Sequence, residues 1–377
     1  MSGLILTEDR SRFFDYLEQM LWRAYYCARK GKRTTEDEHK FEINAAENIH
    51  QLAIDIMTRN YRPTVGIAFI TKEPVIREIF AAPFRDRVVH HVLFNACSGW
   101  WDRRLIYDSY SCRVNKGTHF GIRRLHHHMQ ACSENFTVPC TIVKLDIQGF
   151  FMSLDREKLL KRILWGLDQQ FKGNYNELYH VLKFLWTSVI MDDPVQGVRL
   201  RGKRSDWDQL PTNKSLFNQP EGVGIVIGNL TSQLASNIFL DPLDRYVISD
   251  LGLKHYGRYV DDFYFIVPDS EKEYALACID TISEFLSKLG LTLHPKKHYI
   301  QPISHGVPFL GAVVYPHCTV PGKRIKKEFI RAAYEFASGY ESIESLISYM
   351  GMLSNFQSAK FEKEVFESLG WDYYSKL

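Results

Sequence analysis

The fold is decided by one apolar stretch that two adjacent carboxylates interrupt, Gly257-Arg258-Tyr259-Val260-Asp261-Asp262-Phe263-Tyr264-Phe265-Ile266-Val267. Aromatic and β-branched residues favour strands, so the stretch predicts two strands joined by a tight turn at the aspartates. Adjacent like charges repel each other unless a cation neutralises them. An Asp-Asp pair also occurs in ordinary solvated turns, but the apolar flanks here favour a functional turn.

A second acidic strand end lies far upstream, in Thr141-Ile142-Val143-Lys144-Leu145-Asp146-Ile147-Gln148-Gly149-Phe150-Phe151. The apolar residues predict a strand that ends at Asp146. Three carboxylates on strand ends can hold two divalent ions, which is the arrangement that nucleotidyl transfer needs. Asp146, Asp261 and Asp262 are therefore the candidate catalytic residues and metal ligands.

The composition is that of a globular protein with a large core, since 45% of the 377 residues are hydrophobic and 24% are charged. The net charge is only +3, so total charge gives no argument for nucleic-acid binding. Any such argument must come from local clusters of basic residues.

Seven cysteines are present, and none forms a CxxC pair. This pattern argues against a zinc site or a disulfide framework and favours a reducing compartment. The sequence has neither a signal segment nor an apolar run of 18 residues. We therefore expect a cytoplasmic protein that does not contact a membrane.

Helical periodicity predicts helices over residues 8–30, 37–59, 84–101 and 271–289, with basic helices from 322 onward. The polar segment 191–221 predicts an exposed loop or hairpin. The segment contains a basic run of four residues: Arg199, Arg201, Lys203, Arg204. This run is compatible with contact to nucleic acid or to a partner, and also with contact to neither. The consecutive histidines 126–128 point to three sides of a helix, so we expect surface residues rather than metal ligands.

The order of these motifs resembles the motif series of reverse transcriptases over roughly residues 60–315. An Asp-ended strand precedes a Gly-rich turn and helix, a Tyr-x-Asp-Asp hairpin, a lysine at 297 and a Phe-Leu-Gly hairpin at 309–311. Two segments resemble the enzymes of diversity-generating retroelements more closely: Ile227-Gly228-Asn229-Leu230-Thr231-Ser232-Gln233 and Cys112-Arg113-Val114-Asn115-Lys116-Gly117-Thr118-His119. Retron and group II intron enzymes are the nearby alternatives.

The resemblance implies an α+β right-hand polymerase fold with fingers, a palm with an antiparallel sheet, and a thumb. It places N-terminal helices and fingers at 1–85 and the first part of the palm, with fingers elements, at 86–156. A helical fingers insertion with the exposed loop follows at 157–221. The second part of the palm, with the catalytic hairpin and primer grip, would span 222–315, and a helical basic thumb would span 316–377.

The resemblance also assigns roles to individual residues. Asp146, Asp261, Asp262 and the Ile147 carbonyl would bind two Mg²⁺ ions, for which Mn²⁺ may substitute, and Lys297 would protonate pyrophosphate. Phe151 would exclude a 2′-hydroxyl, and Phe309-Leu310-Gly311 would grip the primer. Further contacts to nucleotide or template are expected from a larger group: Arg77, Arg113, Lys116, Ile227, Gly228, Gln233.

The function implied is an RNA-directed DNA polymerase that makes adenine-mutagenised cDNA for a diversity-generating retroelement. The implied partners are template RNA, the RNA/cDNA duplex, deoxynucleoside triphosphates and an oligomeric accessory variability protein. The alternatives are a retron or group II intron-like enzyme, and a defence-associated relative that acts as an RNA-binding scaffold or an untemplated polymerase.

Overall fold

The structure is a computed structural model that describes residues 8–31, 35–72, 75–340 and 343–371. The chain forms two compact units, each built from three segments. The first unit comprises Met1–Ile106, Ile147–Asp244 and Ser283–Leu293. The second unit comprises Tyr107–Asp146, Arg245–Ile282 and His294–Leu377.

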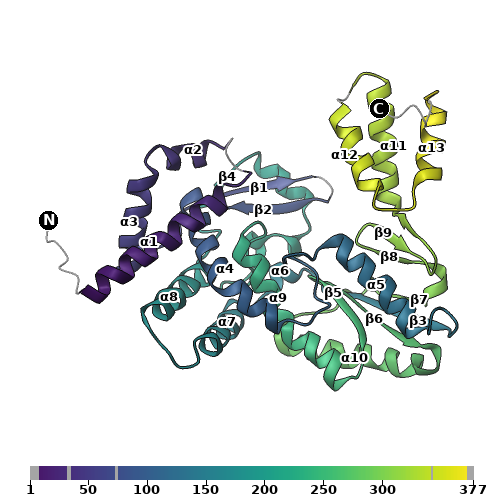
Figure 1. Ribbon diagram of the computed structural model, residues 1–377, viewed down its shortest axis with the longest axis horizontal. Helices are drawn as coiled ribbons and strands as arrows, with labels where there is room; N and C mark the ends of the chain where they lie inside the picture. Colours follow the sequence, from purple (N-terminus) through teal and green to yellow (C-terminus); the bar gives the residue numbers. More distant parts are fainter. Residues whose placement is uncertain (1–7, 32–34, 73–74, 341–342, 372–377) are drawn as a thin grey trace. The chain divides into compact units, whose positions relative to one another are not determined.

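The first unit is mostly helical (Figure 1). Leu17, Leu21 and Ala24 recur at helical spacing on α1 (Glu8–Arg29) and are fully buried. The helix expected over 37–59 is instead two helices that meet at Asn44. The other helices of this unit follow in chain order: α2 (Glu36–Ile43), α3 (Ala45–Met57), α4 (Phe84–Arg104), α6 (Phe150–Ser153), α7 (Arg156–Phe171), α8 (Glu177–Met191) and α9 (Leu230–Arg245).

A small sheet in the first unit has the strand order β2-β1-β4. Its strands are β1 (Ile67–Thr71), β2 (Arg77–Ala81) and β4 (Arg199–Leu200). β1 and β2 are antiparallel, whereas β4 runs parallel to β1. One face of the sheet packs into an apolar cluster that includes Ala68, Phe80, Trp207, Leu216 and Val226.

The segment 191–221 is more buried than its polar composition predicts. Glu78 on β2 is fully buried, and its carboxylate accepts hydrogen bonds of 2.7 Å from Trp207 Nε1, Ser215 Oγ and the Leu216 amide. A buried carboxylate is tolerated only when such donors surround it. The expectation of an exposed loop is therefore wrong for Trp207, Ser215 and Leu216, while Arg199–Ser205 is exposed.

The second unit is centred on a four-stranded sheet in the order β5-β6-β3-β7, with every neighbouring pair antiparallel. The strands are β3 (Cys140–Asp146), β5 (His255–Tyr259), β6 (Asp262–Pro268) and β7 (Tyr299–Pro302). Helix α5 (Thr118–Cys132) contributes Leu125 and Met129 to the core with Ile142 and Tyr264. His128 on this helix is buried, so the prediction of three surface histidines is wrong for this one.

The C-terminal part of the second unit contains a small sheet and three helices (Figure 1). β8 (Val307–Phe309), β9 (Ala312–Val314) and β10 (Thr319–Pro321) pair in the order β10-β9-β8. α11 (Lys323–Ala337), α12 (Ile343–Leu353) and α13 (Ala359–Ser368) share their own apolar cluster. Helix α10 (Lys272–Leu289) contributes to both units. In the part of the chain that the structure describes, no helix is long and apolar enough to span a membrane.

Candidate active site

The three aspartates meet at one end of the second unit's sheet. In the antiparallel ladder of β3 and β6, Asp146 lies directly opposite Asp262. Tyr259 pairs with Asp262 across β5 and β6, so Val260 and Asp261 form a two-residue turn. The register therefore brings residues that are more than a hundred positions apart to one strand end.

The turn itself holds a strained residue. Val260 has φ = 58°, a left-handed conformation that is costly for a β-branched side chain. Strain of this kind costs on the order of 1–3 kcal/mol and persists only where the surroundings enforce it. The guanidinium of Arg258, which is fully buried, donates a 3.0 Å hydrogen bond from Nη1 to the Val260 carbonyl. Arg258 thereby fixes the turn that carries Asp261.

Two lysines lie against the aspartates. Lys297 Nζ is 2.9 Å from Asp146 Oδ2, and Lys144 Nζ is 3.2 Å from Asp262 Oδ2. The sequence analysis singled out Lys297 but missed Lys144. A signal was present, because Lys144 stands two residues before Asp146 in an apolar strand, and side chains two apart in a strand share a face.

The site carries an excess of negative charge. Lost hydration and the neighbouring charge of Asp146 raise the pKa of Asp261 to about 6. Lost hydration also raises the pKa of Asp262, although Lys144 opposes that change. Carboxylates with raised pKa values gain from a bound cation, and carboxylate oxygens are the ligands that Mg²⁺ prefers.

The aspartates are not clustered around a single point. Among the described residues, the only trio of acidic and histidine groups with ligand atoms within 4.8 Å of one another is Glu38, His39 and Glu42. There Arg29 already pairs with both glutamates. The ligand atoms of Asp146, Asp261 and Asp262 therefore do not all lie within that distance of one another.

We predict that Lys144→Met lowers the free energy of unfolding by about 1 kcal/mol at pH 7 in EDTA, because Asp262 loses its partner. The loss should shrink in excess Mg²⁺, which replaces the missing charge. Denaturant unfolding measures both. Lys161→Met is the matched control, since Lys161 pairs with Glu157 at 3.9 Å on an open helix face. An equal loss with and without Mg²⁺ would contradict this assignment.

The expected primer grip forms the turn between β8 and β9. Phe309 pairs with Ala312, and Leu310 and Gly311 both have positive φ, at 50° and 86°. That pattern is a type I′ hairpin turn, for which a glycine at the second position is favoured. Lys144 Nζ donates a 3.0 Å bond to the Pro308 carbonyl, so one lysine contacts both Asp262 and the turn's first strand.

A buried polar network lies beside the hairpin of β5 and β6. The Tyr264 hydroxyl, two residues after Asp262, bonds to the Tyr110 hydroxyl at 2.9 Å and to His128 Nδ1 at 3.1 Å. Arg124 Nε donates to Asp108 at 2.6 Å, and His128 Nε2 lies 3.2 Å from the same carboxylate. Although lost hydration acts to raise it, these hydrogen bonds lower the pKa of Asp108 to about 2. The sequence analysis did not identify this network.

Arg113 and Lys116 also lie in the second unit. Arg113 Nη1 donates a 3.0 Å bond to the Ser109 carbonyl, and Lys116 Nζ lies 4.4 Å from the centre of the Tyr107 ring. Both cations thus contact the segment that precedes them. Their contact with a nucleotide or template stays a prediction.

The remaining candidate residues belong to the first unit. Arg77 begins β2 and is exposed, whereas Ile147 is fully buried. Phe151 is half-buried and packs edge-on against Phe150, with ring centres 5.3 Å apart. The Phe151 carbonyl accepts a 2.8 Å bond from the Ile225 amide, which joins Phe151 to the Gly-rich segment.

The segment at Ile227 and Gly228 approaches β2 closely. The Phe80 amide donates a 3.2 Å hydrogen bond to the Ile227 carbonyl. A Cβ atom at Gly228 would lie 2.9 Å from the Phe80 carbonyl oxygen, and its φ is 127°, so glycine is needed there. Gln233 is exposed on the first turn of α9.

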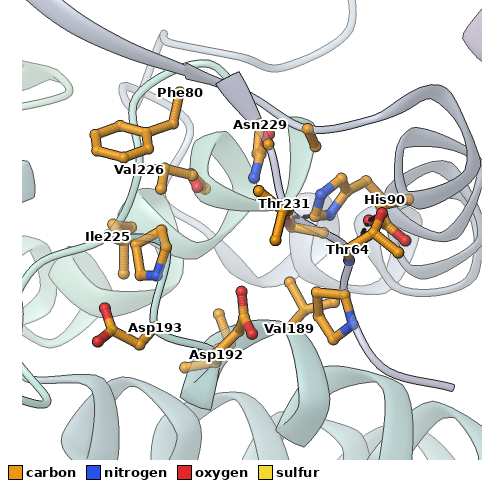
Figure 2. Close-up of a pocket in the computed structure, with 18 of the residues that line it drawn as sticks. Thr64, Phe80, His90, Val189, Asp192, Asp193, Ile225, Val226, Asn229 and Thr231 are labelled. Carbon is orange, nitrogen blue, oxygen red and sulfur yellow. Dashed lines mark hydrogen bonds between the residues drawn. The ribbon is translucent and has the colours of Figure 1, made fainter. Parts of the chain in front are cut away.

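A cavity lies beside this segment (Figure 2). His90 Nδ1 and Thr231 Oγ1 form a 3.0 Å hydrogen bond in its wall, and burial lowers the pKa of His90 to about 4, so the ring is neutral at pH 7. Three carboxylates line the cavity against one arginine: Asp86, Asp192, Asp193 and Arg156. An acidic cavity disfavours a triphosphate, so we do not assign the nucleotide to it.

Comparison with solved structures finds telomerases. The chain is similar to a telomerase from Candida albicans in complex with a TWJ fragment of telomeric RNA, with 12% identity and a TM-score of 0.48 over 90% of this chain and 61% of that one. Apo telomerase from Candida tropicalis has 12% identity and a TM-score of 0.48 over 81% of this chain and 58% of that one. The chain therefore spans about three fifths of the length of these telomerases.

A search of curated proteins found no significant match. The family described as reverse transcriptase (RNA-dependent DNA polymerase) matches residues 77–314, which is well over half of the 377 residues. The matched region contains the three aspartates, Lys297 and the β8–β9 turn. The architecture is the α+β fold of a polymerase, and the chain belongs to the reverse transcriptase family, the RNA-dependent DNA polymerases.

Proposed function

We propose that this protein extends a DNA primer on an RNA template at the site formed by Asp146, Asp261 and Asp262. The observation that carries the proposal is the cross-strand pair of Asp146 and Asp262, with Asp261 in the adjoining turn. Nucleotidyl transfer needs closely placed carboxylates on a rigid support, and four paired strands supply one.

The donor set fits divalent metal ions, since it consists of carboxylates. The pKa values of two of them, Asp261 and Asp262, are raised. We propose that the three aspartates and the Ile147 carbonyl hold two Mg²⁺ ions, for which Mn²⁺ can substitute. When bound, the ions would activate the primer 3′-hydroxyl and neutralise charge on the triphosphate.

Several side chains of the protein would act on the substrates directly. Lys297 is assigned to give a proton to the leaving pyrophosphate, and its ammonium already lies 2.9 Å from Asp146. Arg77 would hold the triphosphate. Phe151 would exclude a 2′-hydroxyl and so select deoxynucleotides. Phe309, Leu310 and Gly311 would position the primer end.

Primer extension tests this function. The full-length protein, an RNA template, a DNA primer and four deoxynucleotides with Mg²⁺ should give DNA whose sequence is complementary to the template. Substituting templates of different sequence should change the product accordingly. DNA of template-independent sequence would instead indicate an untemplated polymerase, and RNA binding without synthesis would indicate a scaffold.

We further propose that the template belongs to a diversity-generating retroelement and that an oligomeric accessory protein assists. The support is the resemblance of residues 112–119 and 227–233 to that subgroup. A cytoplasmic location stays a prediction from the cysteine pattern.

A substitution at Ile227 tests the proposal that the enzyme belongs to a diversity-generating retroelement. Many reverse transcriptases have at this position a glutamine that contacts the nucleotide, and an apolar side chain cannot make that hydrogen bond. Ile227→Gln should lower misincorporation opposite template adenine, by up to about tenfold if one neutral hydrogen bond is regained. Sequencing of the cDNA measures the error spectrum. Unchanged errors at adenine would contradict the proposed role, and Val226→Ile serves as an apolar control.

A further inference from the structure

The cavity shown in Figure 2 lies wholly within the first unit and has the character of a small-molecule site. Its volume is about 370 Å³, which falls within the range of roughly 300–1,000 Å³ that such sites occupy. Part of its wall is apolar and is formed by four residues: Val189, Ile190, Ile225, Val226. Small-molecule sites combine apolar walls with a few polar groups that orient the ligand. The polar groups of this wall therefore indicate which class of ligand fits.

Arg156 places a cation in the wall of the cavity, and only 6% of this residue is exposed. Its Nε donates a 2.7 Å bond to the Gly224 carbonyl, and its Nη1 donates a 2.7 Å bond to the Asp192 carbonyl. In the described part of the chain, Nη2 has no hydrogen-bond partner, and no carboxylate oxygen lies within 4.0 Å of the guanidinium. Burial lowers the pKa of Arg156, although a guanidinium stays charged in proteins. A buried charge without a counter-charge in contact costs free energy.

A carboxylate stands beside that cation without touching it. The side chain of Asp192 forms no hydrogen bond or ion pair with any residue that the structure describes, although its own carbonyl accepts the bond from Arg156. Figure 2 shows Asp192 directed toward the space between Ile225 and Thr231. Asp192 is exposed at the mouth of the cavity, but partial loss of hydration still raises its pKa. Two opposite charges on neighbouring groups therefore both lack a partner in contact.

Ser232 adds a hydroxyl group to the same wall. Only 6% of the residue is exposed, and its hydroxyl has no hydrogen-bond partner among the described residues. The neighbouring Thr231 hydroxyl, by contrast, bonds to His90. Buried polar groups are nearly always hydrogen-bonded, to the protein or to another molecule. An unpaired hydroxyl that lines a cavity is therefore placed to bond a ligand.

The charges of the wall select one class of ligand. A neutral ligand such as a nucleobase would leave the charge of Arg156 unpaired, and an alkyl amine would add a second cation beside it. A polyphosphate would meet the like charges of Asp192 and Asp193. A zwitterion that carries its carboxylate and its ammonium on one carbon atom pairs both unpaired groups at once. An apolar substituent on that carbon atom suits the apolar part of the wall.

We propose that the cavity binds a free α-amino acid with an apolar side chain, with its carboxylate on Arg156 and its ammonium on Asp192. The Ser232 hydroxyl would donate a hydrogen bond to the ligand's carboxylate. The ligand's side chain would lie against the apolar wall, which leads along the chain into Ile227. The site rests on the geometry of the first unit alone and does not depend on the proposed polymerase function.

The test is calorimetric titration of the full-length protein, without nucleic acid or metal, with L-leucine, L-valine and L-phenylalanine. At least one of them should bind, and it should also raise the melting temperature, because a ligand of the folded state stabilises that state. The N-acetyl form of the tightest ligand lacks the ammonium, and its amide lacks the carboxylate. Each should bind at least about tenfold more weakly, since each loses a charged hydrogen bond.

Two variants connect binding to the residues of the wall. Asp192→Asn should weaken the free amino acid by at least about tenfold, whereas Asp208→Asn, an exposed acidic residue outside the cavity, should leave its affinity unchanged. Ser232→Ala should weaken binding by up to about tenfold. It should leave the melting temperature without ligand unchanged, because the hydroxyl has no partner to lose within the described chain.

Three results would overturn the proposal. The first is that none of the three amino acids binds. The second is that the N-acetyl form or the amide binds as tightly as the free amino acid, so that one of the two charges is not recognised. The third is that Asp192→Asn and Asp208→Asn bind the ligand equally well. None of these measurements involves DNA synthesis, so failure here is distinguishable from failure of primer extension.

Discussion

Asp261→Asn is expected to lower the rate of DNA synthesis by at least about a thousandfold, because losing one charged ligand removes several kcal/mol of transition-state stabilisation. Asparagine keeps the size and shape of the side chain, so the turn between β5 and β6 should be retained. Binding of RNA should persist, since Asp261 is an acidic residue and contributes no phosphate contact. Single-turnover primer extension measures the expected loss of synthesis, and a separate RNA-binding measurement tests whether binding persists.

The same variant should be more stable than wild type in EDTA at pH 7. The folded pKa of Asp261 is about 6, above the ordinary 3.8, so its charge costs stability at neutral pH. As the pH falls from above 6 to below 3.8, wild type takes up this proton and the cost disappears. The stabilising effect of Asp261→Asn should therefore be present at pH 7–8 and fade as the pH falls toward 4.

Excess Mg²⁺ should reverse the ranking, because ligand binding to the folded state stabilises wild type more than the variant. Asp250→Asn is a suitable control, since Asp250 is the exposed last residue of a short π-helix, Tyr246–Asp250, outside the site. Near-normal synthesis by Asp261→Asn would refute the assignment of the catalytic carboxylates. An unchanged melting temperature in EDTA would refute only the argument from charge repulsion.

Local sequence predicted the hairpin of β5 and β6 well because strand alternation and turn chemistry are short-range properties. Apolar residues on both sides of Asp261 and Asp262 define two strands and predict a turn at the carboxylates. In the structure Asp261 lies in that turn, whereas Asp262 begins β6. The same reasoning predicted the position of Asp146, which is the polar end of an apolar strand. Asp146 and Asp262 lie opposite each other because of the register between two strands that are distant in the sequence. Sequence spacing does not determine that register.

Residues that act through distant partners were missed. The network of Tyr110, His128 and Tyr264 was not identified, since its hydrogen bonds join positions up to 154 residues apart. Arg258 was not singled out either, although it is buried and bonds to Val260. The segment 191–221 was wrongly expected to be exposed throughout, because a polar segment that surrounds a buried carboxylate has the composition of a loop. Periodicity identifies apolar burial and gives no signal for buried polar groups that satisfy each other.

Gly257→Ala should destabilise the protein by at least about 3 kcal/mol, because it combines overpacking with the loss of buried hydrogen bonds. Gly257 pairs with Tyr264 across β5 and β6. A Cβ atom at Gly257 would lie 2.3 Å from the Tyr110 hydroxyl and 2.7 Å from the Tyr264 hydroxyl. Both distances are far below van der Waals contact, so at least one tyrosine must move.

Neither tyrosine can withdraw easily. The Tyr110 amide is held to the Arg258 carbonyl at 2.9 Å, and the Tyr264 ring packs edge-on against Phe309 with centres 5.2 Å apart. Moving Tyr264 would displace the strand that carries Asp262 or the turn expected to grip the primer. We therefore expect Gly257→Ala to impair synthesis as well as stability, even where the variant remains folded.

Two further variants test whether the loss of stability comes from the clash between the added Cβ atom and the two tyrosine hydroxyls. Gly351→Ala lies in a helix with open space around the added methyl group, so it should be neutral or stabilise by up to about 1 kcal/mol. Tyr110→Phe in the Gly257→Ala background removes the nearest atom and should recover part of the lost stability, giving a coupling of about 1 kcal/mol or more in a double-mutant cycle. Denaturant unfolding of the four proteins measures this coupling. If Gly257→Ala unfolds with wild-type stability, or if Tyr110→Phe adds its own loss without any recovery, the two hydroxyls are not what requires glycine beside the catalytic turn.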